Sequence, residues 1–79
     1  MDIAPVAALL GDPARAAIVG VLYDGRASTA GELARRAGVA PSTASEHLRR
    51  LVDGGLLTVE RSGRQRHFRL ASSEVAHAV

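Results

Sequence analysis

The apolar pattern of this sequence changes its period at Gly54-Gly55, and that change limits the folds open to the chain. Before the two glycines, apolar residues recur at spacings of three and four, which indicates helices that each bury one face. After them, apolar and polar residues alternate, which indicates strands. A Ser62-Gly63 turn separates a strand containing Leu57 and Val59 from a return strand. On the return strand, alternate residues that share one face are Arg64, Arg66, Phe68 and Leu70. The sequence therefore predicts helices followed by a β-hairpin with a basic tip.

Helix start and stop signals divide the first part of the chain. A weak helix is expected over residues 3–10. Asp12 is a good N-cap for a second helix, and Pro13 suits its first position. The helix ends at Asp24-Gly25. Its apolar stripe is Ala14, Ala17, Ile18, Val21 and Leu22.

Two further helices follow with equally clear signals. Ser28 or Thr29 caps the first of them, with Glu32 placed as in a capping box, and Gly38 ends it. Pro41 opens the second, which Gly54-Gly55 closes. Its apolar stripe is Ala44, Leu48, Leu51 and Val52. A last helix is expected from about residue 73, and the sequence stops after little more than one of its turns.

Two short helices joined by a glycine-containing turn and followed by a hairpin form a winged helix-turn-helix. The predicted fold is mainly α with a small two-stranded β-hairpin, in the order helix, helix, helix, recognition helix, hairpin, helix. With 79 residues, one domain spanning residues 1–79 is the limit, its last helix cut short. A core of Ala, Val and Leu with two aromatic residues would gain from a partner subunit.

Composition excludes several classes of protein. The absence of cysteine removes disulfides, thiolate nucleophiles and thiolate metal sites. The chain has neither a phosphate-binding glycine loop nor a grouping of Ser, His and carboxylate, so we do not expect an enzyme. No apolar run reaches the roughly 20 residues of a membrane span, and the N-terminus lacks a secretory signal. These features predict a cytoplasmic protein.

All ten basic residues are Arg, and their distribution is uneven. Residues 1–34 hold two Arg against four acidic residues, whereas residues 35–79 hold eight against four. Residues 61–70 hold four Arg and no acidic residue. A positive field of this kind indicates either a solvated face or a surface that binds nucleic acid.

The exposed face of the predicted recognition helix carries hydroxyl and charged side chains that can reach DNA. An α-helix fits the major groove, where the first residues of a recognition helix meet base edges. Ser45, Glu46 and His47 are expected to choose sequence, whereas Arg49 and Arg50 supply affinity. The alternative for Glu46 is pairing with these Arg residues, and the alternative for Ser42 is helix capping. The DNA-binding residues expected on this helix are Ser42, Thr43, Ser45, Glu46, His47, Arg49 and Arg50.

The hairpin offers a second contact surface. Four arginines, Arg61, Arg64, Arg66 and Arg69, surround the turn, and the tip is expected to lie on phosphates or in a minor groove. Arg61, Arg64 and Arg66 are the DNA-binding residues expected on the hairpin. The rival interpretation is a winged-helix module that docks another protein. Such a module would expose apolar or acidic residues on its fourth helix, whereas this helix exposes hydroxyls and Arg.

The residues also resemble those of a known family, the ArsR-type transcriptional repressors. The resemblance covers nearly the whole chain and is carried by Asp12-Pro13-x-Arg15, Glu32-Leu33-Ala34, the run from Ser42 to Leu51, Gly54-Gly55-Leu56-Leu57 and Gly63-Arg64-x-Arg66-His67-Phe68. It implies a homodimer, built from the first and last helices, that binds a palindromic operator in double-stranded DNA as a repressor and releases it when an effector arrives.

The sequence departs from this family at its metal sites. One family site uses Cys residues before the third helix, where this chain has Thr29-Ala30-Gly31. Another uses an Asp-x-His pair at the start of the last helix, where this chain has Ser72-x-Glu74. Glu74 and His77 have ligand-like spacing, but two ligands are too few for zinc. We therefore expect no metal and no cofactor, and the effector is unknown.

Overall fold

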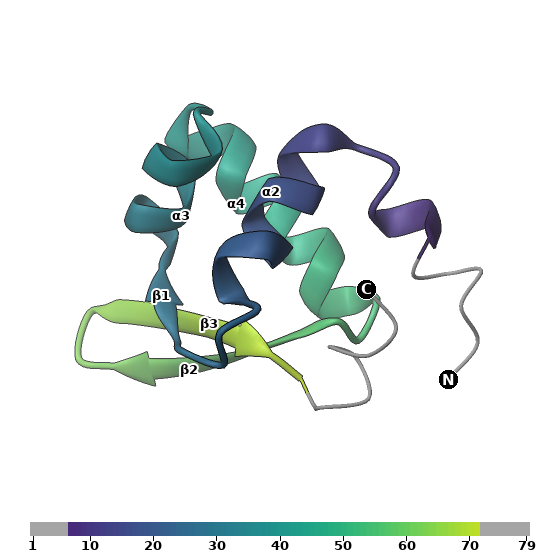
Figure 1. Cartoon of the computed structure of the whole chain (residues 1–79). Helices are drawn as coiled ribbons and strands as arrows, with labels where there is room; N and C mark the ends of the chain where they lie inside the picture. Colours follow the sequence, from purple (N-terminus) through teal and green to yellow (C-terminus); the bar gives the residue numbers. More distant parts are fainter. Residues whose placement is uncertain (1–6, 72–79) are drawn as a thin grey trace.

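The computed structural model describes residues 7–71, in which helices lie on one side of a small antiparallel sheet (Figure 1). The elements are α2 (Pro13–Leu22), β1 (Ser28–Thr29), α3 (Ala30–Ala37), α4 (Pro41–Asp53), β2 (Leu57–Ser62) and β3 (Gln65–Leu70). Residues 7–9, from the expected first helix, are helical. Residues 3–6 of that helix and the whole expected last helix lie outside the described residues.

The capping signals of α2 and α3 act as predicted. The Asp12 carboxylate accepts hydrogen bonds from the amides of Ala14 and Arg15, at 2.8 and 3.3 Å. The Thr29 hydroxyl accepts one from the amide of Glu32 at 3.2 Å. These bonds satisfy amides that a helix leaves without partners at its first turn, and so they fix where each helix begins.

The buried stripe of α2 differs from the predicted one at two positions, Ala17 and Val19. Ile18 and Leu22 are fully buried, but Val19 is buried with them, whereas Ala17 is exposed. The helix is packed against both α3 and α4, so its buried face is centred one residue further along than the apolar pattern indicated. In α4, Ala44, Leu48 and Leu51 are buried as predicted, and Val52 is half-buried.

The sheet has three strands in the order β1-β3-β2, so the expected two-stranded hairpin gains a third strand. Ser28 and Thr29 pair antiparallel with Phe68 and His67. This pairing ties the start of α3 to the middle of the hairpin. Two residues are too few to show the alternation that identifies a strand in sequence.

The hairpin turn is also displaced by one residue from its expected position. Ser62 pairs with Gln65 as the last residue of β2, so Gly63 and Arg64 form the two-residue turn. Gly63 has a φ of 62°, in the left-handed region. A two-residue hairpin loop needs such a φ at its first position, where Gly is favoured.

The core lies between the helices and the inner face of the sheet (Figure 1). It is made of aliphatic side chains and one aromatic ring: Ile18, Val19, Leu22, Leu33, Leu48, Leu51, Leu56, Leu57 and Phe68. All of these side chains are at most 3% exposed. The predicted fold class, a mainly α winged helix-turn-helix, is thereby confirmed.

Candidate nucleic-acid interface

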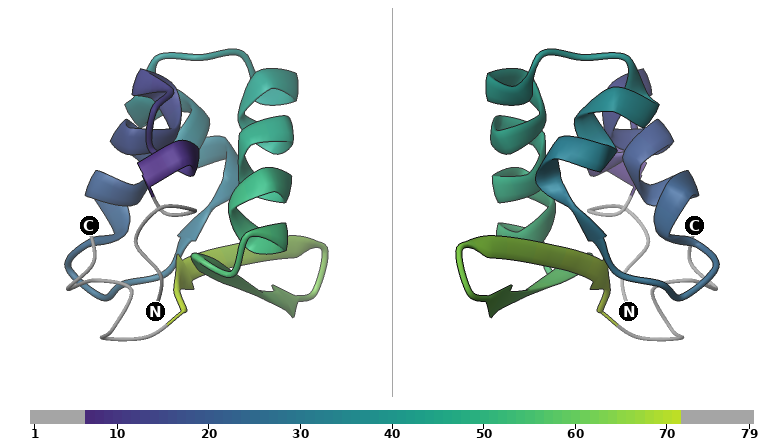
Figure 2. Two further views of the ribbon diagram at one scale, coloured as in Figure 1. Left: turned by 90° about the vertical axis from the view of Figure 1, so that its right-hand side faces the viewer. Right: turned by 90° about the vertical axis from the view of Figure 1, so that its left-hand side faces the viewer.

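The outer face of α4 lies along one side of the molecule, and the β2–β3 hairpin projects beside its C-terminal end (Figure 2). Ser42, Thr43 and Ser45 are exposed at the N-terminal end of this face. The N-cap of α4 is Ala40, and no side chain caps the helix. The Ser42 hydroxyl is therefore not used as a cap, which was the structural alternative to a binding role.

Glu46, by contrast, pairs with Arg49 and Arg50, which the sequence analysis gave as the alternative to a DNA contact. Its carboxylate accepts a 2.7 Å hydrogen bond from Nη2 of Arg49 and a 3.2 Å bond from Nε of Arg50. Arg49 also reaches Asp53 at 3.2 Å. The hydrogen bond from Arg49 is the main cause of the lowered pKa of Glu46, and the same bond raises the pKa of Arg49.

Two Arg and two carboxylates thus neutralise one another along the outer face of α4. These pairs are solvent-exposed, and pairs of this kind contribute little to stability. Their effect is on the electrostatic potential at the outer face of α4. This face presents hydroxyls and a neutral network of ion pairs instead of a positive stripe. Glu46 already accepts three hydrogen bonds from Arg49 and Arg50, which leaves about one of its four acceptor sites for a base.

His47 faces the interior and lies away from the other predicted base-reading residues. Its side chain is 13% exposed, with Nε2 at 3.8 Å from Oδ1 of Asp12 at the start of α2. Its Nδ1 is buried and has no hydrogen-bond partner among residues 7–71. The expectation that His47 reads bases therefore needs correction, because its imidazole packs between α4 and the cap of α2.

The inner face of the hairpin, which is the face turned toward the helices, changes from apolar to basic along its length. The cross-strand pairs on it are Leu57 with Leu70, Val59 with Phe68 and Arg61 with Arg66. Residues directly opposite in an antiparallel pair project to the same side, and like charges there are unfavourable. Arg61 and Arg66 are both exposed and occupy just such a pair. The hairpin therefore carries an electrostatic cost that a bound anion would remove.

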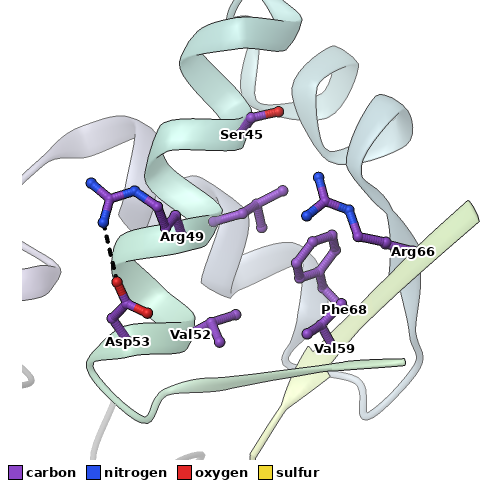
Figure 3. Close-up of a pocket in the computed structure, with 8 residues that line it drawn as sticks. Ser45, Arg49, Val52, Asp53, Val59, Arg66 and Phe68 are labelled. Atoms are coloured by element: carbon purple, nitrogen blue, oxygen red, sulfur yellow. Dashed lines mark hydrogen bonds and ion pairs between the residues drawn. The ribbon is translucent and has the colours of Figure 1, made fainter. Parts of the chain in front are cut away.

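Arg66 also approaches the recognition helix. Its guanidinium lies 5.7 Å from the centre of the Phe68 ring, a cation–π distance. A cavity of about 140 Å³ separates the hairpin from α4. Ser45 and Arg49 line one side of it, and Arg66 and Phe68 line the other (Figure 3). The fold thus brings the helix and hairpin parts of the predicted site to one opening, with Arg61 and Arg64 further out.

Arg35 was not among the predicted site residues. It lies on α3 and shares a second cavity with Arg64 and Arg66 of the hairpin. The only sequence signal for a binding role of Arg35 was its place in the basic second part of the chain. Its proximity to Arg64 and Arg66 depends on how α3 lies against the sheet, which the sequence pattern does not show.

Two negative findings concern the described part of the chain. Within residues 7–71, no three side chains of the His, Asp and Glu types gather where they could hold a metal ion. No helix in this range is both long and apolar enough to cross a bilayer.

Comparison with known proteins places this geometry in a family. Residues 10–60 match the family described as "Helix-turn-helix domain". The chain is 46% identical over 78 residues to YdfF of Bacillus subtilis (strain 168), an uncharacterized HTH-type transcriptional regulator. The match covers 99% of this chain but 34% of YdfF, so the chain spans about a third of the length of that relative.

Solved structures show the same architecture. The homodimeric winged helix-turn-helix DNA-binding domain of Mb0332 from Mycobacterium bovis, described as a possible ArsR-family transcriptional regulator, has a TM-score of 0.85 at 29% identity, covering 95% of this chain and 68% of that one. The transcriptional repressor BigR from Xylella fastidiosa also has a TM-score of 0.85, at 27% identity, covering 95% of this chain and 76% of that one.

These matches confirm the resemblance to ArsR-type regulators that the sequence motifs indicated. The family and the fold are those of transcriptional regulators and not of enzymes. The matched region contains α2, β1, α3, α4 and most of β2. The chain therefore belongs to the helix-turn-helix domain family, in its winged form.

Proposed function

We propose that this chain binds double-stranded DNA as the reading domain of a homodimeric transcriptional repressor. In this proposal α4 enters the major groove of a palindromic operator, and the hairpin lies on the backbone or in the adjacent minor groove. The homodimeric state of the Mb0332 domain and the repressor function of BigR support the proposal. Its main support within this molecule is the Arg61–Arg66 pair on the inner face of the hairpin.

Each side chain has a separate task in this proposal. Ser42, Thr43 and Ser45 contact bases, because their exposed hydroxyls can donate to or accept from base edges. Arg61 and Arg66 contact phosphates, and the DNA charge relieves their mutual repulsion. Glu46, Arg49 and Arg50 form a network that exchanges partners when the helix enters the groove.

The described surface fits DNA better than it fits a protein partner. Among residues 7–71, the large apolar side chains that are exposed are Tyr23 and Val59. Tyr23 lies at the C-terminal end of α2. A different protein docked on the hydroxyl face of α4 would need a contiguous apolar centre there, which Ser42, Thr43 and Ser45 do not supply.

A titration against DNA at several salt concentrations tests the proposal. The logarithm of the binding constant should fall by about 0.9 per phosphate neutralised for each tenfold rise in salt. Binding to a library-selected duplex, with half-sites about 10 base pairs apart or a multiple of that, should be much tighter than binding to a mixed sequence. No duplex binding at low salt would contradict the proposal.

A matched pair of variants locates the contact on the inner face of the hairpin. Arg61→Thr removes a charge from that face, whereas Arg69→Thr removes one from the opposite face, where Arg69 pairs with Thr58. We expect Arg61→Thr to reduce the salt slope by about one and to weaken all duplexes similarly. We expect a smaller change for Arg69→Thr. Equal effects of the two substitutions would count against the assigned face.

A further inference from the structure

The second cavity lies between α3 and the turn end of the hairpin, outside the recognition helix. It has a volume of about 440 Å³ and is open to solvent. Three of the side chains around it are arginines from two elements, and none is acidic. Its lining residues are Thr29, Ala30, Gly31, Arg35, Arg64, Gln65 and Arg66.

The conformation of Arg35 directs its charge to this cavity. A methyl group placed on Gly31 would meet Nη1 of Arg35 at 3.6 Å, so the guanidinium folds back over the first turn of α3 and beside the cavity wall. Arg36, the next residue, instead pairs with Glu32 at 3.9 Å. Neighbouring arginines on α3 thus differ: Arg36 has a carboxylate partner, whereas Arg35 has none among residues 7–71 and lines a cavity.

The other two arginines of the cavity resemble Arg35 in this respect. Among residues 7–71, no carboxylate lies within ion-pair distance of Arg35, Arg64 or Arg66, whereas Arg49 and Arg50 are both paired. Three arginine side chains around one opening, with no carboxylate partner among residues 7–71, favour an anion with several acceptor oxygens. Phosphate has that chemistry, and Arg is the residue best suited to it.

The position of the cavity indicates the source of the phosphate. Arg66 lines both this cavity and the one between α4 and the hairpin, so the two openings adjoin. When the second helix of a helix-turn-helix lies in the major groove, the first helix crosses the DNA backbone. Here that first helix is α3, and Arg35 is the side chain that it contributes.

We propose that the cavity formed by Arg35, Arg64 and Arg66 binds a backbone phosphate of the DNA duplex. This inference rests on the proposed DNA-binding function and extends it to α3, which then clamps one phosphate against the hairpin. Such a contact carries no base information, but it fixes the angle between the recognition helix and the wing on the duplex.

The test compares Arg35→Ala with Arg36→Ala, because each substitution removes one positive charge from the same helix. We expect Arg35→Ala to lower the salt slope by about one and to weaken selected and mixed duplexes alike, by about five- to tenfold. Arg36→Ala should change the slope much less. Arg35→Lys keeps the charge and should retain most of the slope.

The outcomes separate this inference from the proposed function. If the parent chain binds no duplex, both fail. If it binds with a steep slope and Arg35→Ala has the same slope, only the phosphate clamp is overturned. A titration with inorganic phosphate, followed by the NMR shift of the Gly31 amide, tests the other source of phosphate. The backbone contact would be overturned if Arg35→Ala abolished this shift but left the salt slope of duplex binding unchanged. The cavity would then be assigned to a free phosphate.

Discussion

At the scale of single residues, Asp12 has two roles in the structure. It caps α2 through the amides of Ala14 and Arg15, and its carboxylate lies 3.8 Å from the His47 imidazole. The bond from the Ala14 amide is the main cause of its lowered pKa. A folded pKa below the unfolded value of 3.8 means that the carboxylate stabilises the fold above that pH. The contribution is lost as pH falls from the unfolded toward the folded pKa.

Asp12→Asn separates the capping role from the charge. Asn is as good an N-cap as Asp, so this variant should keep most of the thermal stability at pH 7, whereas Asp12→Ala should lose more. As pH falls below about 4 toward the lowered folded pKa of Asp12, the advantage of the parent chain over Asp12→Asn should shrink, because the carboxylate becomes protonated and is then as uncharged as Asn. Thermal melts followed by circular dichroism from pH 7 to pH 2 measure both effects. An advantage that persists at pH 2 would contradict the assigned cause.

The errors of prediction at this scale have one origin. Helical spacing places His47 at the flank of the outer face of α4, but the side chain turns to a partner 35 positions earlier in the chain. Arg35 was missed for the same reason, since its cavity exists only once α3 and the hairpin are packed. Periodicity reports which face of a helix a residue occupies, and it carries no information about residues brought close by tertiary structure.

At the scale of elements, local signals specified most of the structure. Caps and prolines located the starts of α2, α3 and α4, because those signals act within one helical turn. They could not reveal β1, whose two residues gain their strand form from pairing with Phe68 and His67. The turn was placed one residue early because Ser62 and Arg64 can each flank the required Gly63.

Two glycine substitutions with opposite expected signs test the backbone argument for the turn. Gly63 has a φ of 62° with open space around it, so Gly63→Ala adds strain without a clash and should lower the free energy of unfolding by about 1 kcal/mol or more. Gly20, inside α2, also has open space, and Gly20→Ala should raise that free energy by roughly 0.5–1 kcal/mol. Urea denaturation measures both changes. Destabilisation by both variants would show that conformation is not the cause.

At the scale of the whole molecule, charge is divided between elements. The outer face of α4 is neutralised by its own carboxylates, whereas Arg35 and the hairpin arginines have no carboxylate partner among residues 7–71. The imbalance between the two parts of the sequence predicted a basic surface. It could not show that the field belongs to the wing more than to the recognition helix, because side-chain pairing within α4 decides that.

Dimerisation is the prediction that belongs to this scale. The small aliphatic core and the homodimeric Mb0332 domain both favour a two-subunit form. Sedimentation equilibrium should show a dimer at micromolar concentration, and the melting temperature should rise with protein concentration, since association stabilises the folded state. A monomer at high micromolar concentration, with a melting temperature independent of concentration, would contradict the prediction for this chain.

The neutral network on α4 also bears on how such a regulator changes over evolutionary time. In the proposed function the hairpin and α3 hold the attraction to bulk DNA, so substitutions at Ser42, Thr43 or Ser45 should redirect the domain to a new operator while its total occupancy of the chromosome stays almost constant. Duplicated copies of the gene could then diverge in their targets one base pair at a time, without passing through a form that has lost its hold on DNA.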